Sequence, residues 1–271
     1  MAIDSSTFID TDIQIHRLSP DVDAKNAVKE EIDNAEYTAM SAFSLLELKG
    51  NYIQALILLR RKIADGKNIG DVMARINNTG GRKVTLMFLQ LANKIGRIDF
   101  NSKPWEENRQ ILLTLLDSQI ASSWMIFTGV VDYVCDDFDC TRASEEPEFV
   151  SNKWFAPIPK CRKDNTNCSI IEFIEVRKDD LARLIDLLGK IPKEEITSEL
   201  QRIKNVCEET LRDGAFPQEK NVCRQVGDML IGLQSKIGKE ILSSNYKEHS
   251  YLSEGLGYNF RQFPYADVRS K

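Results

Sequence analysis

From residue 226 to residue 263 the sequence alternates between helical and strand patterns, and this alternation constrains the fold more than any other feature. Apolar residues recur at helical spacing until Gly238, which marks the end of that helix. A short apolar strand follows at 240–243, then a helix at 246–254 and a closing strand at 258–263. Helix, strand, helix and strand in this order are typical of an α/β protein with a parallel sheet.

The start of the chain fits the same architecture. Residues 2–3 predict a first strand that runs into Asp4, and residues 38–43 predict a second strand. Apolar residues at helical spacing over 44–64 then predict a long helix with Glu47 in its first turn. We therefore predict an α/β fold of three layers, α/β/α, around a central and mostly parallel sheet.

The middle of the sequence reads differently. Residues 66–116 are predicted to be helical, and residues 134–168, which hold four of the six cysteines, to be irregular. A strand is predicted at 170–176, and amphipathic helices at 179–188 and 194–211. The sheet is thus expected to come from the two ends of the chain, with a largely helical insertion between them.

Composition narrows the classes of protein. In 271 residues, 42% are hydrophobic and 28% are charged, which is ordinary usage for a chain that buries a core. The formal net charge of −5 excludes a highly basic nucleic-acid coat protein. Apolar stretches are far shorter than the roughly 20 residues of a membrane span, and no secretory signal is visible at the start. We expect a cytoplasmic protein with reduced thiols and no membrane partner.

Three carboxylates and one amide of the predicted fold are candidates for a binding site. Asp4 ends the first strand, Glu47 follows the second, Asp228 lies in the late helix, and Asn245 follows the strand after it. Ligands of open α/β sheets bind at the carboxyl ends of the strands, so these side chains are expected to meet there. Clustered carboxylates repel one another unless a cation neutralises them, and their hard oxygens suit Mg²⁺ or Mn²⁺.

These residues lie in motifs that resemble those of the PIN-domain family, the metal-dependent ribonucleases that include the toxins of many toxin-antitoxin pairs. The motifs occur in family order at residues 4–9, 41–48, 227–232 and 241–245. The resemblance implies that Asp4, Glu47 and Asp228 are acidic metal ligands, and that Asn245 stands where the family often has Asn or Asp. It also implies that Ser6 assists the first aspartate.

What the resemblance implies for function is a Mg²⁺- or Mn²⁺-dependent endonuclease that hydrolyses phosphodiester bonds, in RNA rather than DNA, with an antitoxin-like protein as a partner. The catalytic residues would be Asp4, Glu47, Asp228 and Asn245. A catalytically inactive PIN-like module that binds nucleic acid or protein is the alternative. A metal-dependent mechanism needs no covalent nucleophile, because the metal activates water.

The position of the third acid fixes the predicted domains. With Asp228 as the third acid, residues 1–65 and 215–271 form one discontinuous nuclease domain, and residues 66–214 form the insertion. Asp117 also lies in a segment that resembles the third motif and remains the alternative third ligand. We favour Asp228 because the strand, helix and strand that surround Asn245 complete a sheet.

The cysteine-containing segment suggests a second metal. Cys135, Cys140, Cys161 and Cys168 are separated by four, twenty and six residues, loosely like a four-thiolate structural zinc site. Tight Cys-x-x-Cys pairs are absent, so buried reduced thiols are the competing interpretation. His16 and His249 have no sequence neighbours that would make them ligands, and solvated or helix-capping roles are expected for both.

Overall fold

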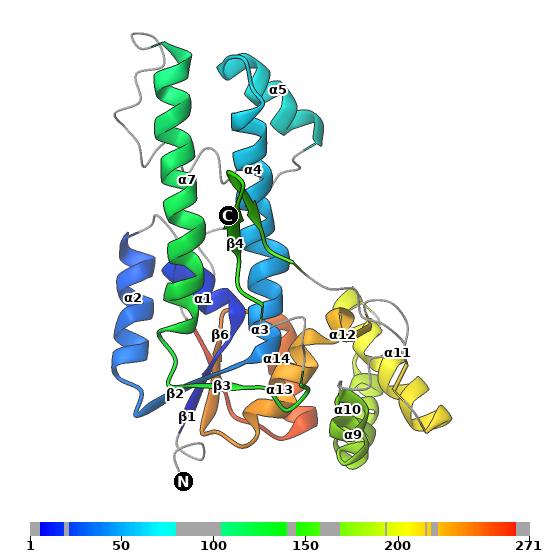
Figure 1. The fold of residues 1–271 in the computed structure, drawn as a ribbon. Helices are drawn as coiled ribbons and strands as arrows, with labels where there is room; N and C mark the ends of the chain where they lie inside the picture. Colours follow the sequence, from blue (N-terminus) through cyan, green and yellow to red (C-terminus); the bar gives the residue numbers. More distant parts are fainter. Residues whose placement is uncertain are drawn as a thin grey trace. The chain divides into compact units, whose positions relative to one another are not determined.

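The computed structural model describes most of the chain, and the chain divides into two compact units. The described residues are 6–18, 22–79, 104–139, 145–157, 169–192, 194–214, 216–217 and 222–263 (Figure 1). The first unit consists of Met1–Leu46, Val130–Ser144 and Pro159–Lys271, and the second of Glu47–Gly129 and Glu145–Ile158.

A five-stranded sheet forms the centre of the first unit. Its strands, in spatial order, are β3 (Tyr133–Cys135), β2 (Tyr37–Ser41), β1 (Ser6–Ile9), β6 (Glu240–Ser243) and β7 (Phe260–Gln262). Each of the four neighbouring pairs in this sheet is parallel. The predicted mixed α/β class with a mostly parallel sheet is therefore confirmed, and the strands expected near 38–43, 240–243 and 258–263 are present.

The first described strand lies later in the chain than the sequence predicted. β1 is the run Ser6-Thr7-Phe8-Ile9, and all four residues are buried. A strand in the middle of a sheet has both faces covered, so it need not alternate polar and apolar residues. Asp4 and the residues expected to form the first strand lie outside the described residues.

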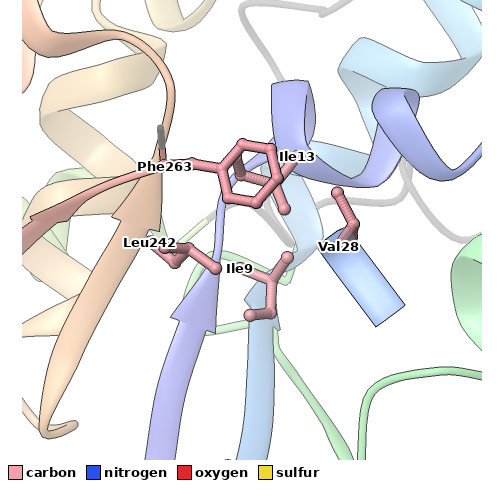
Figure 2. Packing of buried hydrophobic residues seen from close by; sticks show 5 residues of the cluster. All are labelled: Ile9, Ile13, Val28, Leu242 and Phe263. Atoms are coloured by element: carbon pink, nitrogen blue, oxygen red, sulfur yellow. The ribbon is translucent and has the colours of Figure 1, made fainter. Parts of the chain in front are cut away.

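Helices cover both faces of the sheet. On one face, Ile9 and Leu242 pack with Ile13 of α1 (Thr11–Arg17), Val28 of α2 (Val22–Asp33) and Phe263 (Figure 2). α1 and α2 therefore cover the face of the sheet that carries Ile9 and Leu242. Phe8 and Ile241, the preceding residues of the two strands, lie on the opposite face.

On the other face, Ser41 of β2 donates a hydrogen bond of 2.5 Å to Gln234 of α13 (Gly227–Ser235). Ser41 lies on the same face of β2 as Ala39, which pairs with Phe8, so α13 covers the opposite face from α1. Helices on both faces are compatible with the predicted three-layer arrangement. The chain then runs through β6 into α14 (Tyr246–Leu256), which contacts α13.

Within the described residues, the first unit also contains α9 (Ile170–Glu175), α10 (Lys178–Lys190), α11 (Ser198–Asp213) and α12 (Val222–Gln225). The strand predicted at 170–176 is wrong, because this segment is α9. Ile170, Phe173 and Ile174 are its buried residues, and this spacing of three and four is helical. Four of the six residues of α9 are apolar, and this density hides the helical period because a mostly apolar run fits a buried strand equally well.

The second unit contains a pair of long helices and a hairpin. After α3 (Ala42–Glu47) come the π-helical segment η2 (Leu48–Ile53), α4 (Gln54–Ala64) and α5 (Ile69–Thr79), while α7 (Trp105–Thr128) packs against α4. Strands β4 (Glu148–Val150) and β5 (Lys153–Phe155) pair antiparallel. Ser151 and Asn152 between them have positive φ values of 50° and 60°, as a tight two-residue hairpin turn requires.

The bounds of the two units differ from the domain bounds predicted at residues 65 and 215. β3 adds to β2 through the pairs Ala39↔Tyr133 and Met40↔Val134, which brings a segment from the middle of the chain into the sheet. In addition, α10 packs against α14, and a Cβ at Gly255 would come within 2.7 Å of Leu184. Strand addition and helix packing therefore join much of the expected insertion to the first unit.

Helix α7 is long and apolar, which is relevant to the expectation that the chain has no membrane span. Among the helices within the described ranges, it alone is long and apolar enough to cross a bilayer, with 24 residues and a mean hydropathy of 1.3. Core helices of soluble proteins meet the same criterion. Asp117 in its middle forms an ion pair with Arg60 of α4, so this helix carries a paired charge at its centre.

Candidate functional site

The candidate site lies where the chain order of the sheet reverses. From β1 the chain builds outward through β2 and β3, and it later returns to the other side of β1 with β6 and β7. Open α/β sheets bind ligands outside the carboxyl ends of their strands at such a switch point. Asp10 directly follows β1 here, and Ser244 and Asn245 directly follow β6.

Asp10 is held by three elements at once. It caps the N-terminus of α1, where its Oδ1 accepts the Thr11 N–H at 2.6 Å. Its Oδ2 accepts the Ser243 hydroxyl at 2.6 Å and lies 3.2 Å from Nε2 of His249. The carboxylate is buried, with 4% of the residue exposed. Asp10 therefore joins the first strand, the end of β6 and helix α14.

Asp12 lies in the first turn of α1 and faces the loop after β6. Its Oδ2 accepts the Ser244 N–H at 2.9 Å and also the Ser244 hydroxyl. Its Oδ1 is buried and has no hydrogen-bond partner among the residues that the structure describes. A buried carboxylate oxygen without a donor costs free energy, which a bound cation would recover.

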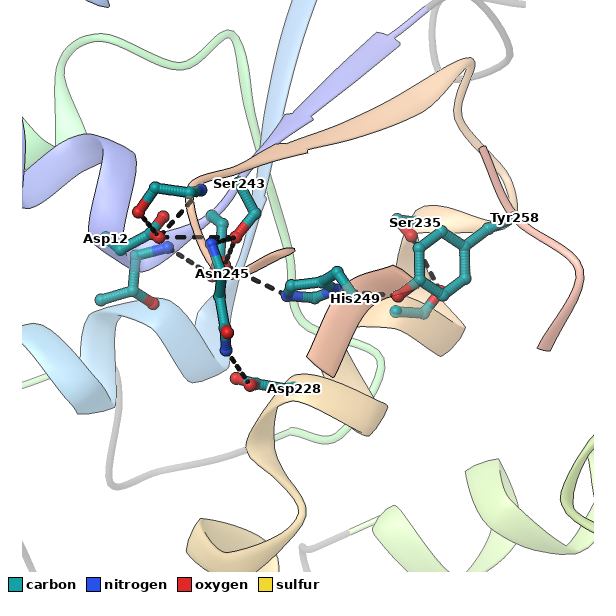
Figure 3. A network of polar contacts seen from close by, with 11 residues as sticks. Asp12, Asp228, Ser235, Ser243, Asn245, His249 and Tyr258 are labelled. Atoms are coloured by element: carbon teal, nitrogen blue, oxygen red, sulfur yellow. Dashed lines mark hydrogen bonds and ion pairs between the residues drawn. The ribbon is translucent and has the colours of Figure 1, made fainter. Parts of the chain in front are cut away.

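Asp228 and Asn245 meet on the other side of this loop. The Asn245 side chain donates from Nδ2 to Oδ2 of Asp228 at 2.9 Å, and its backbone N–H donates to the Ser243 hydroxyl oxygen at 3.0 Å. Figure 3 shows Asn245 between Ser243 and Asp228. The amide thus links α13 to the carboxyl end of β6.

His249 occupies the centre of this polar network. The side chain comes from α14 and is fully buried. Its Nδ1 lies 2.8 Å from the hydroxyl of Tyr258 (Figure 3), and its other ring nitrogen, Nε2, faces Asp10. Three side chains thus form a buried chain from Tyr258 through His249 to Asp10.

His249 and Asp10 shift each other's pKa in opposite directions. Burial disfavours the charged imidazole, yet the hydrogen bond and charge of Asp10, with the charges of Asp228 and Asp12, raise the pKa of His249 to about 9. Burial likewise acts to raise the pKa of Asp10, but His249, Ser243 and Thr11 together hold that pKa below its ordinary value of 3.8. Asp10 and His249 therefore form a buried ion pair at neutral pH.

The pKa values of the other two carboxyl groups, Asp12 and Asp228, are raised. Burial and then the charge of Asp10 raise the pKa of Asp12 to about 7, although Ser244 opposes this. Burial raises the pKa of Asp228 to about 7 as well, where the charge of Asp10 adds to it and the charge of His249 opposes it. A cation near both groups would favour their ionised forms.

The residues predicted from the sequence are brought together only in part. Asp228 and Asn245 are in contact, as expected for neighbours in one site. Asp4 lies outside the described residues, and the acid at the carboxyl end of the first described strand is Asp10. Glu47 is the last residue of α3, is partly exposed, and belongs to the second unit.

Asp117, the alternative third acid, lies in different surroundings. Its carboxylate accepts hydrogen bonds from the Arg60 guanidinium, including one of 3.0 Å from Nη2, and one of 2.6 Å from the Trp154 indole. All three residues belong to the second unit. Asp117 thus has the contacts of a structural ion pair that joins α4, α7 and β5.

Of the four cysteines considered for zinc, the structure describes Cys135 alone. It is buried at the end of β3 and contacts the Asp137 carboxylate at 3.1 Å, and burial raises its pKa well above the usual range. A thiol with a raised pKa is a poor thiolate ligand. Cys140, Cys161 and Cys168 lie outside the described residues.

The oxygen donors near the switch point can be compared with what a divalent cation requires. Within the described ranges, no three His, Cys, Asp or Glu side chains converge as a metal-binding group. Asp10, Asp12 and Asp228 nevertheless offer the hard oxygens that Mg²⁺ and Mn²⁺ prefer, and Oδ1 of Asp12 is the buried acceptor that lacks a partner. The chemistry of the donors and the orphaned oxygen thus fit such an ion.

Sequence reasoning missed Asp10, Asp12 and His249. Asp10 and Asp12 follow a run of β-branched and aromatic residues, and this was the available signal for a strand end. His249 had none, because Asp10 lies 239 residues away in the sequence. The expected solvated or capping role of His249 is wrong, since the side chain is fully buried.

Comparison with known proteins gives no relative: no family model, no curated protein and no solved structure matches this chain.

Proposed function

We propose that the first unit is a hydrolase of phosphodiester bonds that depends on Mg²⁺ or Mn²⁺, with RNA as its substrate. The observation that carries this proposal is that Asp10, Asp12 and Asp228 all lie around the loop after β6, connected through Ser243, Ser244 and Asn245, at the switch point of the sheet. Two of these acids have a pKa raised to about 7, and one oxygen of Asp12 lacks a partner. Perturbed carboxyl groups at the expected ligand site of a fold favour function over structure.

Asp10, Asp228 and Asn245 would hold the cation, with Asp12 as a further oxygen donor. When bound, a divalent cation supplies an activated water and stabilises charge on the phosphate. The chain itself keeps Asp10 ionised through His249 and Ser243. Asn245 holds the Asp228 carboxylate in place through its 2.9 Å hydrogen bond.

The likeness to the PIN-domain family supports the choice of RNA. The likeness rests on motifs that contain Asp4, Glu47, Asp228 and Asn245 in family order, so Asp4 stays a predicted ligand, and Asp10 is added on the geometry of the described site alone. Glu47 follows β2 in the chain and stays a predicted ligand. Cytoplasmic location and an antitoxin-like partner remain part of this proposal.

A binding module without catalysis is the second candidate. It is favoured by the buried ion pair between His249 and Asp10, which neutralises part of the cluster without any cation. In that case the first unit would bind nucleic acid or protein, and its acids would be structural.

The proposal is tested by incubating purified protein with single-stranded RNA and with DNA of the same sequence. We expect cleavage of RNA with Mn²⁺ or Mg²⁺ and none with excess EDTA, because the carboxylates need the ion to act on phosphate. Product lengths on a denaturing gel give the measurement. Cleavage that continues in EDTA contradicts the metal mechanism, and RNA that stays intact with both ions favours the binding module.

A further inference from the structure

A chain of buried side chains connects Asp10, which follows β1, with helix α13, which carries Asp228. The Tyr258 hydroxyl lies 2.8 Å from Nδ1 of His249, and Nε2 of His249 lies 3.2 Å from Oδ2 of Asp10. His249 is fully buried, and 8% of Tyr258 is exposed. Because water is excluded, the packing around these two side chains fixes the direction from which Asp10 receives its hydrogen bond.

Tyr258 also rests on the helix that carries Asp228. A Cβ at Gly232 of α13 would lie 2.7 Å from Cε1 of the tyrosine ring and 3.2 Å from its hydroxyl oxygen. Gly232 is four residues after Asp228, so the two positions lie on the same face of α13, one turn apart. The phenol therefore fits closely against α13 at one end and reaches Asp10, through His249, at the other.

We propose that His249 and Tyr258 are positioning residues that set the separation of Asp10 and Asp228, and through it the affinity of the site for a divalent cation. This inference rests on the proposed function, since it takes these acids as cation ligands. Hydrogen-bond partners that stand behind metal ligands orient them, and losing such a partner commonly weakens metal binding about 10- to 100-fold.

The hydrogen bonds can form in either protonation state of the ring. Nε2–H of His249 donates to Asp10 in the neutral tautomer and in the cation. Tyr258 then donates its hydroxyl proton to Nδ1 of the neutral ring, or accepts the proton of the charged ring. The positioning role therefore belongs to the geometry of the chain.

The test is the affinity for Mn²⁺, measured by the decrease of the free-ion EPR signal on titration into the full-length protein. Tyr258→Phe and His249→Gln should each weaken Mn²⁺ binding about 10-fold or more. The double variant should be no weaker than the worse single variant, because both residues act through one chain. Excess Mn²⁺ should restore most cleavage by Tyr258→Phe, which a misfolded variant would not allow.

Tyr52→Phe is the matched control. Tyr52 is also 8% exposed, and its hydroxyl accepts a 2.8 Å hydrogen bond from Gln119, but it lies in the second unit. Its Mn²⁺ affinity should equal that of the wild type. If His249→Gln fails to fold, Tyr258→Phe, which removes a single oxygen, decides the question.

The possible outcomes distinguish the positioning role of His249 and Tyr258 from the proposed function. Wild-type Mn²⁺ affinity in Tyr258→Phe, or losses that add in the double variant, would overturn the positioning role and leave the proposed function standing. A wild-type protein that binds no Mn²⁺ would overturn both.

Discussion

Asp228→Asn is expected to lower the rate of Mn²⁺-dependent RNA cleavage by at least about 1,000-fold, because a bound metal contributes several kcal/mol of charge stabilisation. The substitution removes an anionic ligand from a buried cluster. The amide oxygen of the new side chain can still accept the hydrogen bond from Asn245, so we expect the local geometry to be retained. Stability without metal should be equal or higher, since one of several repelling carboxyl groups is gone.

Asp117→Asn is the matched control, because it makes the same chemical change in the second unit. Cleavage should stay near the wild-type rate, while the second unit should lose about 2 kcal/mol as the charged hydrogen bonds to Arg60 weaken. All three tryptophans, at positions 105, 124 and 154, belong to the second unit, so their fluorescence reports its unfolding. If Asp117→Asn abolishes cleavage and Asp228→Asn does not, the catalytic acid belongs to the second unit.

The first unit is expected to lose stability as the pH rises from about 4 to about 9 in the absence of metal. The pKa of Asp12 and that of Asp228 are each about 7 in the folded protein against an ordinary value of 3.8. The pKa of His249 is about 9 against an ordinary value of 6.5. Each value is raised by folding, so each contribution is complete below the unfolded value and is lost as the pH passes the folded value.

The two parts of this profile can be separated. Between pH 6.5 and 9 the His249 contribution alone corresponds to about 3 kcal/mol. Hydrogen exchange of the Phe8 and Leu242 amides measures the first unit, and tryptophan fluorescence measures the second. Asp228→Asn should make the profile below pH 7 less steep, with the Asp12 contribution remaining, and should shift the upper part to lower pH, because the Asp228 charge helps to raise the pKa of His249. A first unit whose stability rises steadily from pH 5 to pH 9 would contradict the assigned shifts.

The late part of the sheet could be predicted because its signals are local. The helix near Asp228, the strand at β6 and the helix at α14 each carry a clear period between plain turn residues. The contact between Asp228 and Asn245 followed from this order, since only 17 residues separate them.

The first described strand was not predicted, for a physical reason. The sequence predicts a strand at residues 2–3 that runs into Asp4, which lie outside the described residues, whereas β1 spans Ser6–Ile9 and buries both Ser6 and Thr7 as a central strand. Polar residues inside a central strand weaken the apolar signal of that strand, so Asp10 at its end was not predicted. The buried chain through His249 and Tyr258 could not be predicted, because it depends on contacts with residues more than 200 positions away and on the space at Gly232.

We propose that the acids at the switch point bind a divalent cation, and a crystal soaked in Mn²⁺ would locate that ion. The anomalous scattering of manganese locates the ion independently of any assumption about ligands. We expect a peak within coordination distance, about 2.0–2.4 Å, of carboxylate oxygens from Asp228 and from Asp10 or Asp12. No peak there at saturating Mn²⁺, with the Asp10–His249 ion pair intact, would contradict it.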